Sequence, residues 1–179
     1  MSVKQKTISK AVSLQGIGLH TGNEVSLTFK TAAVSTGFTF VRTDLEGQPA
    51  IEALACYVSD TQRGTNIEKN GVVINTSEHV LAAVVGLDID NIVIEIDAPE
   101  PPIMDGSSKY FVEILEEAGI EEQEAEREVY EVKEKISYKD EESGSEIMNM
   151  QTDKYEVTTI VYFGPKILGK KNATRKKLD

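Results

Sequence analysis

The residues best suited to chemistry in this chain are a carboxylate and an imidazole that are adjacent in the sequence, Glu78 and His79. They precede a short apolar segment whose pattern predicts a helix. In the first turn of a helix, the dipole favours an ionised carboxylate and disfavours an imidazolium. A neutral imidazole can bind a metal ion, and a carboxylate beside it can accept a proton from water. The pair is therefore compatible with metal-assisted hydrolysis.

The pattern alone favours structural roles for these residues. Asn75 stands three residues before Glu78, which is the spacing of a capping box at a helix N-terminus. An isolated histidine is more often a core or surface residue with one hydrogen bond than a ligand. A catalytic zinc usually takes three protein ligands, and the chain has only one further histidine, His20, and one cysteine, Cys56. We therefore expect the remaining ligands of any metal site to lie outside these 179 residues.

His20 lies in a glycine-rich segment, residues 15–22, in which three glycines surround it. Glycines at this density are typical of a turn with unusual backbone angles. The pattern alone favours a hairpin turn with an incidental histidine. It is not a nucleotide-binding glycine loop, because no helix follows it.

Residues 1–120 are predicted to form a sheet covered by two helices. Alternating or continuous apolar residues indicate strands at residues 25–30, 38–41, 72–74 and 91–96. The first helix covers residues 80–85 and ends at Gly86, and the second covers residues 110–118, begins at Ser107 or Ser108 and ends at Gly119. The expected fold class is α+β, with two helices packed on a sheet in a two-layer domain.

A second, strand-rich region is predicted after an acidic segment. Residues 121–128 contain almost no apolar side chain and indicate a solvated linker. Residues 129–179 carry strand patterns at 129–138, 146–150 and 155–163, and then a basic tail that is predicted to be a solvated end. No helix follows to cover these strands, so the region is expected to be the opening of a truncated domain. Self-association through its uncovered face is a further prediction.

Composition narrows the classes of function. The formal net charge of −11 disfavours a nucleic-acid partner, because nucleic-acid binding requires a basic surface. No apolar run is long enough for membrane insertion, and no secretory leader is visible. A single cysteine cannot form an intramolecular disulfide. The expected location is the cytoplasm.

Five segments of the chain together resemble a known family, the zinc-dependent UDP-3-O-acyl-N-acetylglucosamine deacetylases of lipid A biosynthesis. The resemblance covers residues 4–120 well and continues more weakly to the end. The segments occur in the family's order and at close to its spacing. They are Gly16-Ile17-Gly18-Leu19-His20-Thr21-Gly22, Arg42-Thr43-Asp44-Leu45, Thr76-Ser77-Glu78-His79-Val80-Leu81-Ala82-Ala83, residues 86–95, and Pro102-Ile103-Met104-Asp105-Gly106-Ser107.

The resemblance implies a fold and roles for particular residues. Family members have two similar domains, each a sheet with two helices, and the active site lies between the helix layers. Glu78 matches the general base, and His79 matches a zinc ligand. His20 matches a histidine near the mouth of the site. The implied cofactor is zinc, and the implied substrate is a UDP-linked acylated amino sugar. The loop that contains Arg63, Gly64 and Thr65 aligns with a stretch that borders this substrate.

The resemblance also implies what is missing. The family's other two zinc ligands, its second catalytic histidine and the insert that holds the acyl chain come later than residue 179. In some bacteria a 3-hydroxyacyl-carrier-protein dehydratase is fused to the deacetylase. The chain is thus expected to comprise a first deacetylase domain (1–120), the linker (121–128) and the opening strands of a second domain (129–179), and to be an inactive fragment that binds zinc weakly. The alternative is a non-catalytic short paralogue that acts as a binding or regulatory partner.

Overall fold

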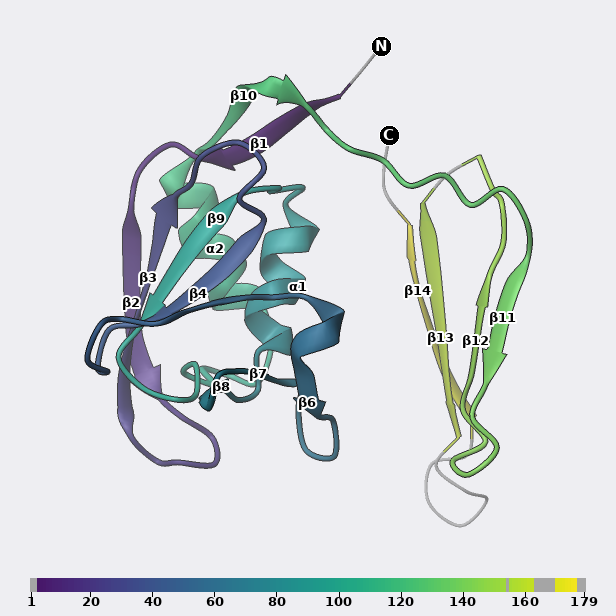
Figure 1. Cartoon of the computed structure of the whole chain (residues 1–179), viewed down its shortest axis with the longest axis horizontal. Helices are drawn as coiled ribbons and strands as arrows, with labels where there is room; N and C mark the ends of the chain where they lie inside the picture. The colour runs from purple at the N-terminus through teal and green to yellow at the C-terminus, as the bar shows by residue number, and fades with distance from the viewer. Residues whose placement is uncertain (1–2, 154, 163–169, 177–179) are drawn as a thin grey trace. The chain divides into compact units, whose positions relative to one another are not determined.

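The chain divides into two compact units, Met1–Arg127 and Glu128–Asp179. The computed structural model (Figure 1) describes residues 3–153, 155–162 and 170–176. The predicted functional residues all lie in the first unit.

The first unit is built on a five-stranded sheet. The strand order is β2 (Val12–Ile17), β3 (Glu24–Thr31), β9 (Ile92–Ile96), β4 (Phe38–Arg42) and β5 (Ala50–Glu52). The β4–β9 pair is parallel, and the other pairs are antiparallel. Alternate side chains of the central strands face one apolar core, as the period of two requires. The fully buried members include Leu27, Phe29, Phe40, Ile92, Ile94 and Ile96.

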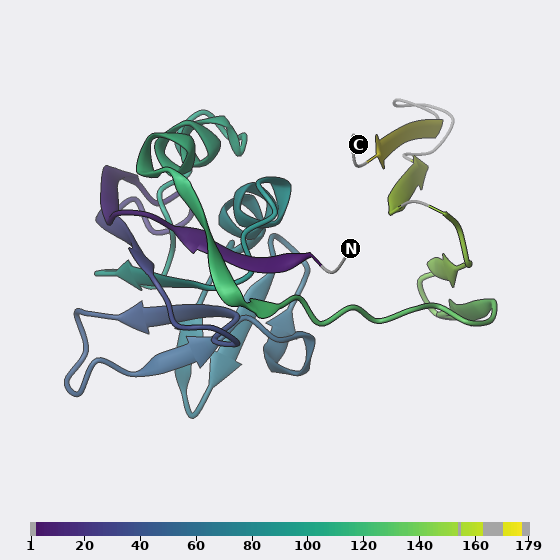
Figure 2. The same cartoon turned by 90° about the horizontal axis from the view of Figure 1, so that it is seen from above.

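Two helices, α1 (Glu78–Gly86) and α2 (Lys109–Ala118), form the second layer. Figure 2 shows both helices on the same side of the sheet. Each helix buries three side chains in the same core as the strands; these are Val80, Ala83 and Val84 from α1 and Phe111, Leu115 and Ala118 from α2. The prediction of an α+β fold with two helices on a sheet is confirmed.

A three-stranded sheet leads into α1. It contains β6 (Val58–Asp60), β7 (Asn66–Lys69) and β8 (Val72–Ile74), and a short 3-10 helix (Ala55–Tyr57) precedes it. The turn between β7 and β8 is Asn70-Gly71, and both residues have positive φ, 53° and 79°. Asparagine followed by glycine is the preferred sequence for this type of tight hairpin turn. The predicted strand at residues 72–74 is confirmed.

The segment predicted as a solvated linker is instead a strand. β10 (Ile120–Glu126) pairs in antiparallel fashion with β1 (Lys4–Ile8), and the two strands lie side by side in Figures 1 and 2. Most side chains of β10 are exposed and acidic, so its sequence lacks the apolar alternation that marks a half-buried strand. Backbone pairing with β1 and a few polar anchors hold it in place.

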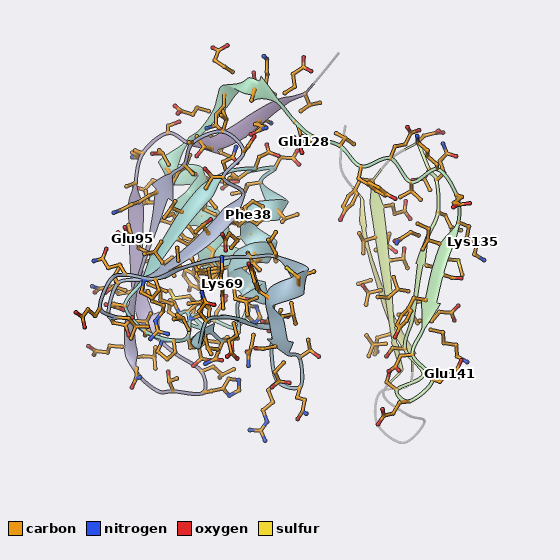
Figure 3. All side chains as sticks on the ribbon, in the orientation of Figure 1. Phe38, Lys69, Glu95, Glu128, Lys135 and Glu141 are labelled. Carbon is orange, nitrogen blue, oxygen red and sulfur yellow. The ribbon has the colours of Figure 1, made fainter. Side chains whose placement is uncertain are left out.

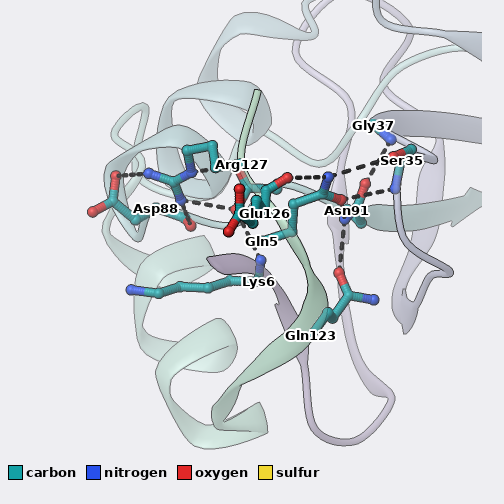
Figure 4. Close-up of polar contacts among 10 residues, drawn as sticks. Gln5, Lys6, Ser35, Gly37, Asp88, Asn91, Gln123, Glu126 and Arg127 are labelled. Carbon is teal, nitrogen blue, oxygen red and sulfur yellow. Dashed lines mark hydrogen bonds and ion pairs between the residues drawn. The ribbon is translucent and has the colours of Figure 1, made fainter. Parts of the chain in front are cut away.

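Figure 4 shows these polar anchors. The buried amide nitrogen of Asn91 donates to Oε1 of Gln5 (2.8 Å) and to Oε1 of Gln123 (2.7 Å). Oδ1 of Asn91 accepts from the backbone of Gly37 (2.9 Å). At the end of β10, Nη2 of Arg127 donates to Oδ2 of Asp90 (2.8 Å). β10 is thus held in place by hydrogen bonds to polar side chains of the unit, and not by burial of apolar side chains.

The second unit contains two hairpins in its described part. The strands are β11 (Ile136–Lys139) with β12 (Glu146–Asn149), and β13 (Glu156–Tyr162) with β14 (Lys170–Lys176). The strand predicted at 129–138 begins only at Ile136. Residues 170–176 of the basic tail, predicted to be a solvated end, form β14. Residue 163, predicted to end the preceding strand, and residue 177 of the tail lie outside the described residues.

No helix occurs among the described residues of the second unit, and many of its apolar side chains are exposed. Figure 3 shows its side chains projecting from both faces of the hairpins. The interpretation of this unit as the opening strands of a second domain stays a prediction, as does self-association through it. Within the described part of the chain, no helix has the length and apolarity needed to span a membrane.

Candidate active site

Glu78 and His79 are the first two residues of α1. Their side chains are partly exposed, by 38% and 30%, and His79 Nε2 lies 3.9 Å from Oε1 of Glu78. The residue before the helix is Ser77, and its side chain makes no capping bond to the helix. The capping box predicted for Asn75 is therefore not formed. Instead, Oε2 of Glu78 accepts a hydrogen bond from the backbone of Thr65 (2.8 Å), which orients the carboxylate.

The loop before β7 lies directly against Glu78. A Cβ atom added at Gly64 would lie 3.2 Å from Oε1 of Glu78 and 3.2 Å from Oγ1 of Thr76. Only a residue without a side chain leaves both of these oxygens undisturbed. The amide of Thr65 thus binds the candidate base, and Gly64 leaves no space beside that base for a side chain.

His20 and Arg63 both line a hollow of about 240 Å³. The lining residues come from three segments of the chain and are His20, Asp60, Arg63, Asn66, Asn75 and Thr76. All of the lining residues are of polar or charged types, and the charged ones include both signs. All six sequence-predicted residues are therefore brought to one end of the first unit, where Thr76 connects the hollow to the start of α1.

The sequence analysis missed a buried carboxylate at this place, Glu100. Its relative exposure is 0%. Its oxygens accept hydrogen bonds from the backbone of His20 (3.0 and 3.2 Å), from the backbone of Thr21 (3.0 Å) and from the hydroxyl of Thr76 (3.0 Å). A Cβ atom at Gly18 would overlap the hydroxyl of Thr21 and lie 2.8 Å from Oε2 of Glu100. The glycines around His20 were the available signal, since they allow this close approach.

The hydrogen bonds set the charge of Glu100. Burial raises the pKa of its carboxyl, but the bonds from Thr21, His20 and Thr76 stabilise the carboxylate more strongly. The pKa therefore lies below its ordinary value of 4.5, and the group is a buried anion at neutral pH.

Further contacts fix the turn that carries Glu78. Arg42 forms a two-bond ion pair with Asp44 (2.7 and 2.8 Å) and donates to the carbonyl of Val73 (2.9 Å). The hydrogen bond from Arg42 lowers the pKa of Asp44. Oδ1 of Asn66 accepts from the backbone of Thr76 (3.1 Å), and Asn75 donates from its backbone to Pro99 (2.7 Å). The start of α1 is thus tied to the three-stranded sheet and to the five-stranded sheet with the loop after β9.

The donor set for a metal ion is incomplete in this part of the protein. Among the described residues, no three His, Cys, Asp or Glu side chains form a group that could hold an ion. His79 offers one imidazole ligand, and Glu78 offers one acceptor for a water proton. A catalytic zinc site usually has three protein ligands, so these two residues fit only part of such a site.

The family model and the relatives that match this chain all point to the same family. Residues 5–178 match the family LpxC, UDP-3-O-acyl N-acetylglycosamine deacetylase. The chain is 42% identical over 172 residues to the bifunctional enzyme LpxC/FabZ of Bacteroides thetaiotaomicron, covering 96% of this chain and 37% of that protein. It is 46% identical over 139 residues to the UDP-3-O-acyl-N-acetylglucosamine deacetylase of Myxococcus xanthus, covering 78% and 44%.

A third relative, the UDP-3-O-acyl-N-acetylglucosamine deacetylase of Actinobacillus succinogenes, is 46% identical over 147 residues, covering 82% of this chain and 48% of that protein. The chain spans less than half of the length of these relatives. The family match extends over nearly all of the chain, and the residues of the candidate site lie within it. The chain therefore belongs to the metal-dependent UDP-3-O-acyl-N-acetylglucosamine deacetylase family.

Proposed function

We propose that this chain carries the Glu78–His79 share of a zinc-dependent amide hydrolase. The reaction is removal of the N-acetyl group from UDP-3-O-acyl-N-acetylglucosamine in lipid A biosynthesis, in the cytoplasm. The observation that carries this proposal is the orientation of Glu78, whose Oε2 is held by Thr65 while its side chain stays accessible beside His79. Family membership supplies the substrate class.

The two carboxylate oxygens of Glu78 have different surroundings. Because Oε2 accepts the bond from Thr65, Oε1 is the atom placed to take a proton from the attacking water. The water oxygen adds to the acetamide carbonyl carbon. The C–N bond then breaks, the proton held by Glu78 passes to the leaving amine, and acetate is released. A bound zinc ion supplies a Lewis acid that polarises the carbonyl and acidifies water, and His79 would be one of its ligands.

The hollow beside the base is the proposed substrate side of the site. His20 and Arg63 line it, and a UDP-linked sugar carries phosphate charges that such side chains can bind. Gly64 borders both the hollow-lining residue Thr76 and the base Glu78. We assign Thr65 to orientation of the base and the other three residues to the substrate.

The test is acetate release and zinc content of the full-length protein and its variants. Glu78→Gln is expected to lower kcat by about 10²- to 10⁴-fold, because it removes the proton acceptor, while zinc content stays unchanged. His79→Ala is expected to lower zinc content and turnover together. Glu116→Gln, an exposed glutamate on α2, is the matched control and should behave as wild type. Full turnover by Glu78→Gln, or a zinc-loaded wild type that releases no acetate, would contradict the proposal.

A second candidate function is a non-catalytic binding or regulatory partner. The exposed apolar side chains of the second unit, among them Tyr138, Ile147 and Ile160, favour it. Mixing the 179-residue chain with a full-length deacetylase and measuring a stable complex by size-exclusion chromatography would support this role. Separate elution of the two proteins would exclude the role of a binding or regulatory partner.

A further inference from the structure

Glu100 connects the two segments that form the substrate side of the site. The segment around His20 gives it two backbone donors, His20 and Thr21, and the turn before α1 gives it the hydroxyl of Thr76. His20, Thr21 and Thr76 lie 80, 79 and 24 residues away from Glu100 along the chain. No other described side chain accepts bonds from both segments. Glu100 is therefore the shared acceptor between the His20 segment and the Thr76 turn.

The surroundings of Glu100 reinforce this connection. Gly18 forms a β-bridge with Pro102, and the backbone of Ile103 donates to the carbonyl of Ile17 (2.9 Å). A Cβ atom at Gly16 would lie 2.8 Å from Cβ of Pro102. The loop that carries Glu100 is thus in close contact with residues 16–18 as well as with His20 and Thr21.

The chemistry of the bonds explains why a carboxylate is needed. Three donors converge on Glu100, and an ionised carboxylate is an acceptor only, with enough lone pairs for all of them. A glutamine would place an NH₂ group, itself a donor, against at least one of these donors. Hydrogen bonds to an ionised acceptor are about twice as strong as neutral ones. Glu100 thus holds the His20 backbone more tightly than a neutral side chain of the same shape could.

Resting on the proposed function, we propose that Glu100 is a positioning residue for substrate binding: its buried carboxylate fixes His20 against Thr76, and so shapes the hollow that takes the substrate. Glu100 has no exposed surface, so it acts through His20 and does not touch the substrate. The base Glu78 is held separately by Thr65. Loss of Glu100 is therefore expected to weaken substrate binding and to leave the chemical step intact.

The test compares Glu100→Gln with Asp97→Asn in the full-length protein. Asp97 is a matched control, because it is three residues earlier, accepts a backbone bond from Ser26 (2.8 Å) and is exposed away from the hollow. With UDP-3-O-acyl-N-acetylglucosamine as substrate, Glu100→Gln is expected to raise KM by about 10-fold or more and to change kcat by less than about threefold, in line with the loss of one charge-assisted bond. Asp97→Asn should leave both constants as in wild type.

A second readout is independent of activity. Hydrogen exchange of the peptide that contains residues 18–22 is expected to accelerate by about 10-fold or more in Glu100→Gln, because the amides of His20 and Thr21 lose their charged acceptor and keep at most the weaker, neutral oxygen of glutamine. Exchange in β9 should accelerate less than at residues 18–22, and by no more than the measured loss of global unfolding free energy accounts for. A merely structural defect would instead lower the active fraction, which reduces kcat at unchanged KM and accelerates exchange throughout the unit.

Unchanged KM and unchanged exchange at residues 18–22 would overturn the proposal, as would a loss of kcat alone. If Glu100→Gln does not fold, Gly18→Ala decides, because its added methyl group presses on the same carboxylate and leaves the charge in place. It is expected to raise KM and accelerate exchange at residues 18–22 in the same way, and wild-type values for both would overturn the proposal. If wild-type protein releases no acetate, the proposed function fails, and the exchange measurement alone decides whether Glu100 positions His20.

Discussion

The hydroxyl of Thr76 donates a hydrogen bond to Oε1 of Glu100 over 3.0 Å, which joins the turn before α1 to the loop after β9. Thr76 is buried and has a positive φ of 51°, a backbone conformation that is unfavourable for a β-branched residue. The strain is maintained by bonds on two sides, from Thr76 to Glu100 and from the Thr76 backbone to Asn66. The two residues therefore hold a strained turn next to the candidate base.

Removal of the Thr76 hydroxyl should destabilise the first unit. Thr76→Val keeps the shape and the strain but leaves the buried carboxylate with one donor fewer, which is expected to cost about 1–3 kcal/mol of unfolding free energy. Thr76→Ser keeps the hydroxyl and should cost less than about 1 kcal/mol. Urea unfolding followed by circular dichroism measures the difference, and equal stabilities of the two variants would contradict the role given to this bond.

The lowered pKa of Glu100 predicts a pH dependence of stability. Because the folded pKa lies below the unfolded value of 4.5, the group contributes stability that is fully present above about pH 4.5 and is lost as the pH falls through the folded pKa. Wild type should therefore exceed Glu100→Gln in unfolding free energy by more at pH 7 than at pH 3. Urea unfolding of both proteins between pH 3 and pH 7 tests this, and a difference that is constant or grows toward acid pH would refute it.

Substitution by alanine should destabilise the protein at Gly18 but not at Gly86. Gly18→Ala introduces a methyl group against Thr21 and Glu100 and is expected to lower the unfolding free energy by about 1–3 kcal/mol. Gly86 is the last residue of α1, and nothing lies within 4 Å of an added Cβ atom. Gly86→Ala should therefore be neutral or raise stability by up to about 1 kcal/mol. Thermal unfolding of both variants gives the comparison, and a neutral Gly18→Ala would show that the close approach of its loop is not required.

Gln123 should matter for stability although the strand that carries it is acidic and exposed. Its Oε1 accepts from Asn91 (2.7 Å), and its Nε2 donates to the carbonyl of Ala32 (2.8 Å). Gln123→Ala removes both bonds and is expected to cost about 1–3 kcal/mol. Glu124→Ala, next to it on β10 and exposed, should change stability by less than about 0.5 kcal/mol. Similar effects of the two substitutions in urea unfolding would argue against the Asn91–Gln123 contact.

Apolar periodicity was sufficient to predict the central layer of the first unit. The strands near residues 25–30 and 91–96 and the second helix were predicted from apolar side chains on one face, and the first helix from a compact apolar segment that ends at Gly86. β10 was missed because its pairing depends on backbone bonds and on Gln123 and Arg127, which leave no apolar period in the sequence. Apolar periodicity therefore cannot predict an element, such as β10, that polar contacts hold in place.

The candidate site was predicted only in part for a similar reason. The residues Glu78, His79 and His20 have chemistry that is visible in their types, whereas Glu100 stands among prolines in a segment that reads as a stiff loop. Its importance depends on partners about 80 residues away, and spacing along the chain does not reveal such contacts. The Thr65 amide is likewise invisible in sequence, because any residue supplies a backbone donor.

The pairing of β1 with β10 has a consequence for how the first unit forms during protein synthesis. Gln5 on β1 bonds to the carbonyl of Glu126, 121 residues away in the chain. Contacts of such high contact order form late and slowly, because a long loop must close before they contribute. Until β10 has left the ribosome, β1 stays an unpaired edge that can pair with other chains. A nascent chain halted before residue 120 is therefore expected to aggregate or to engage chaperones, and release of a few more residues should end that exposure.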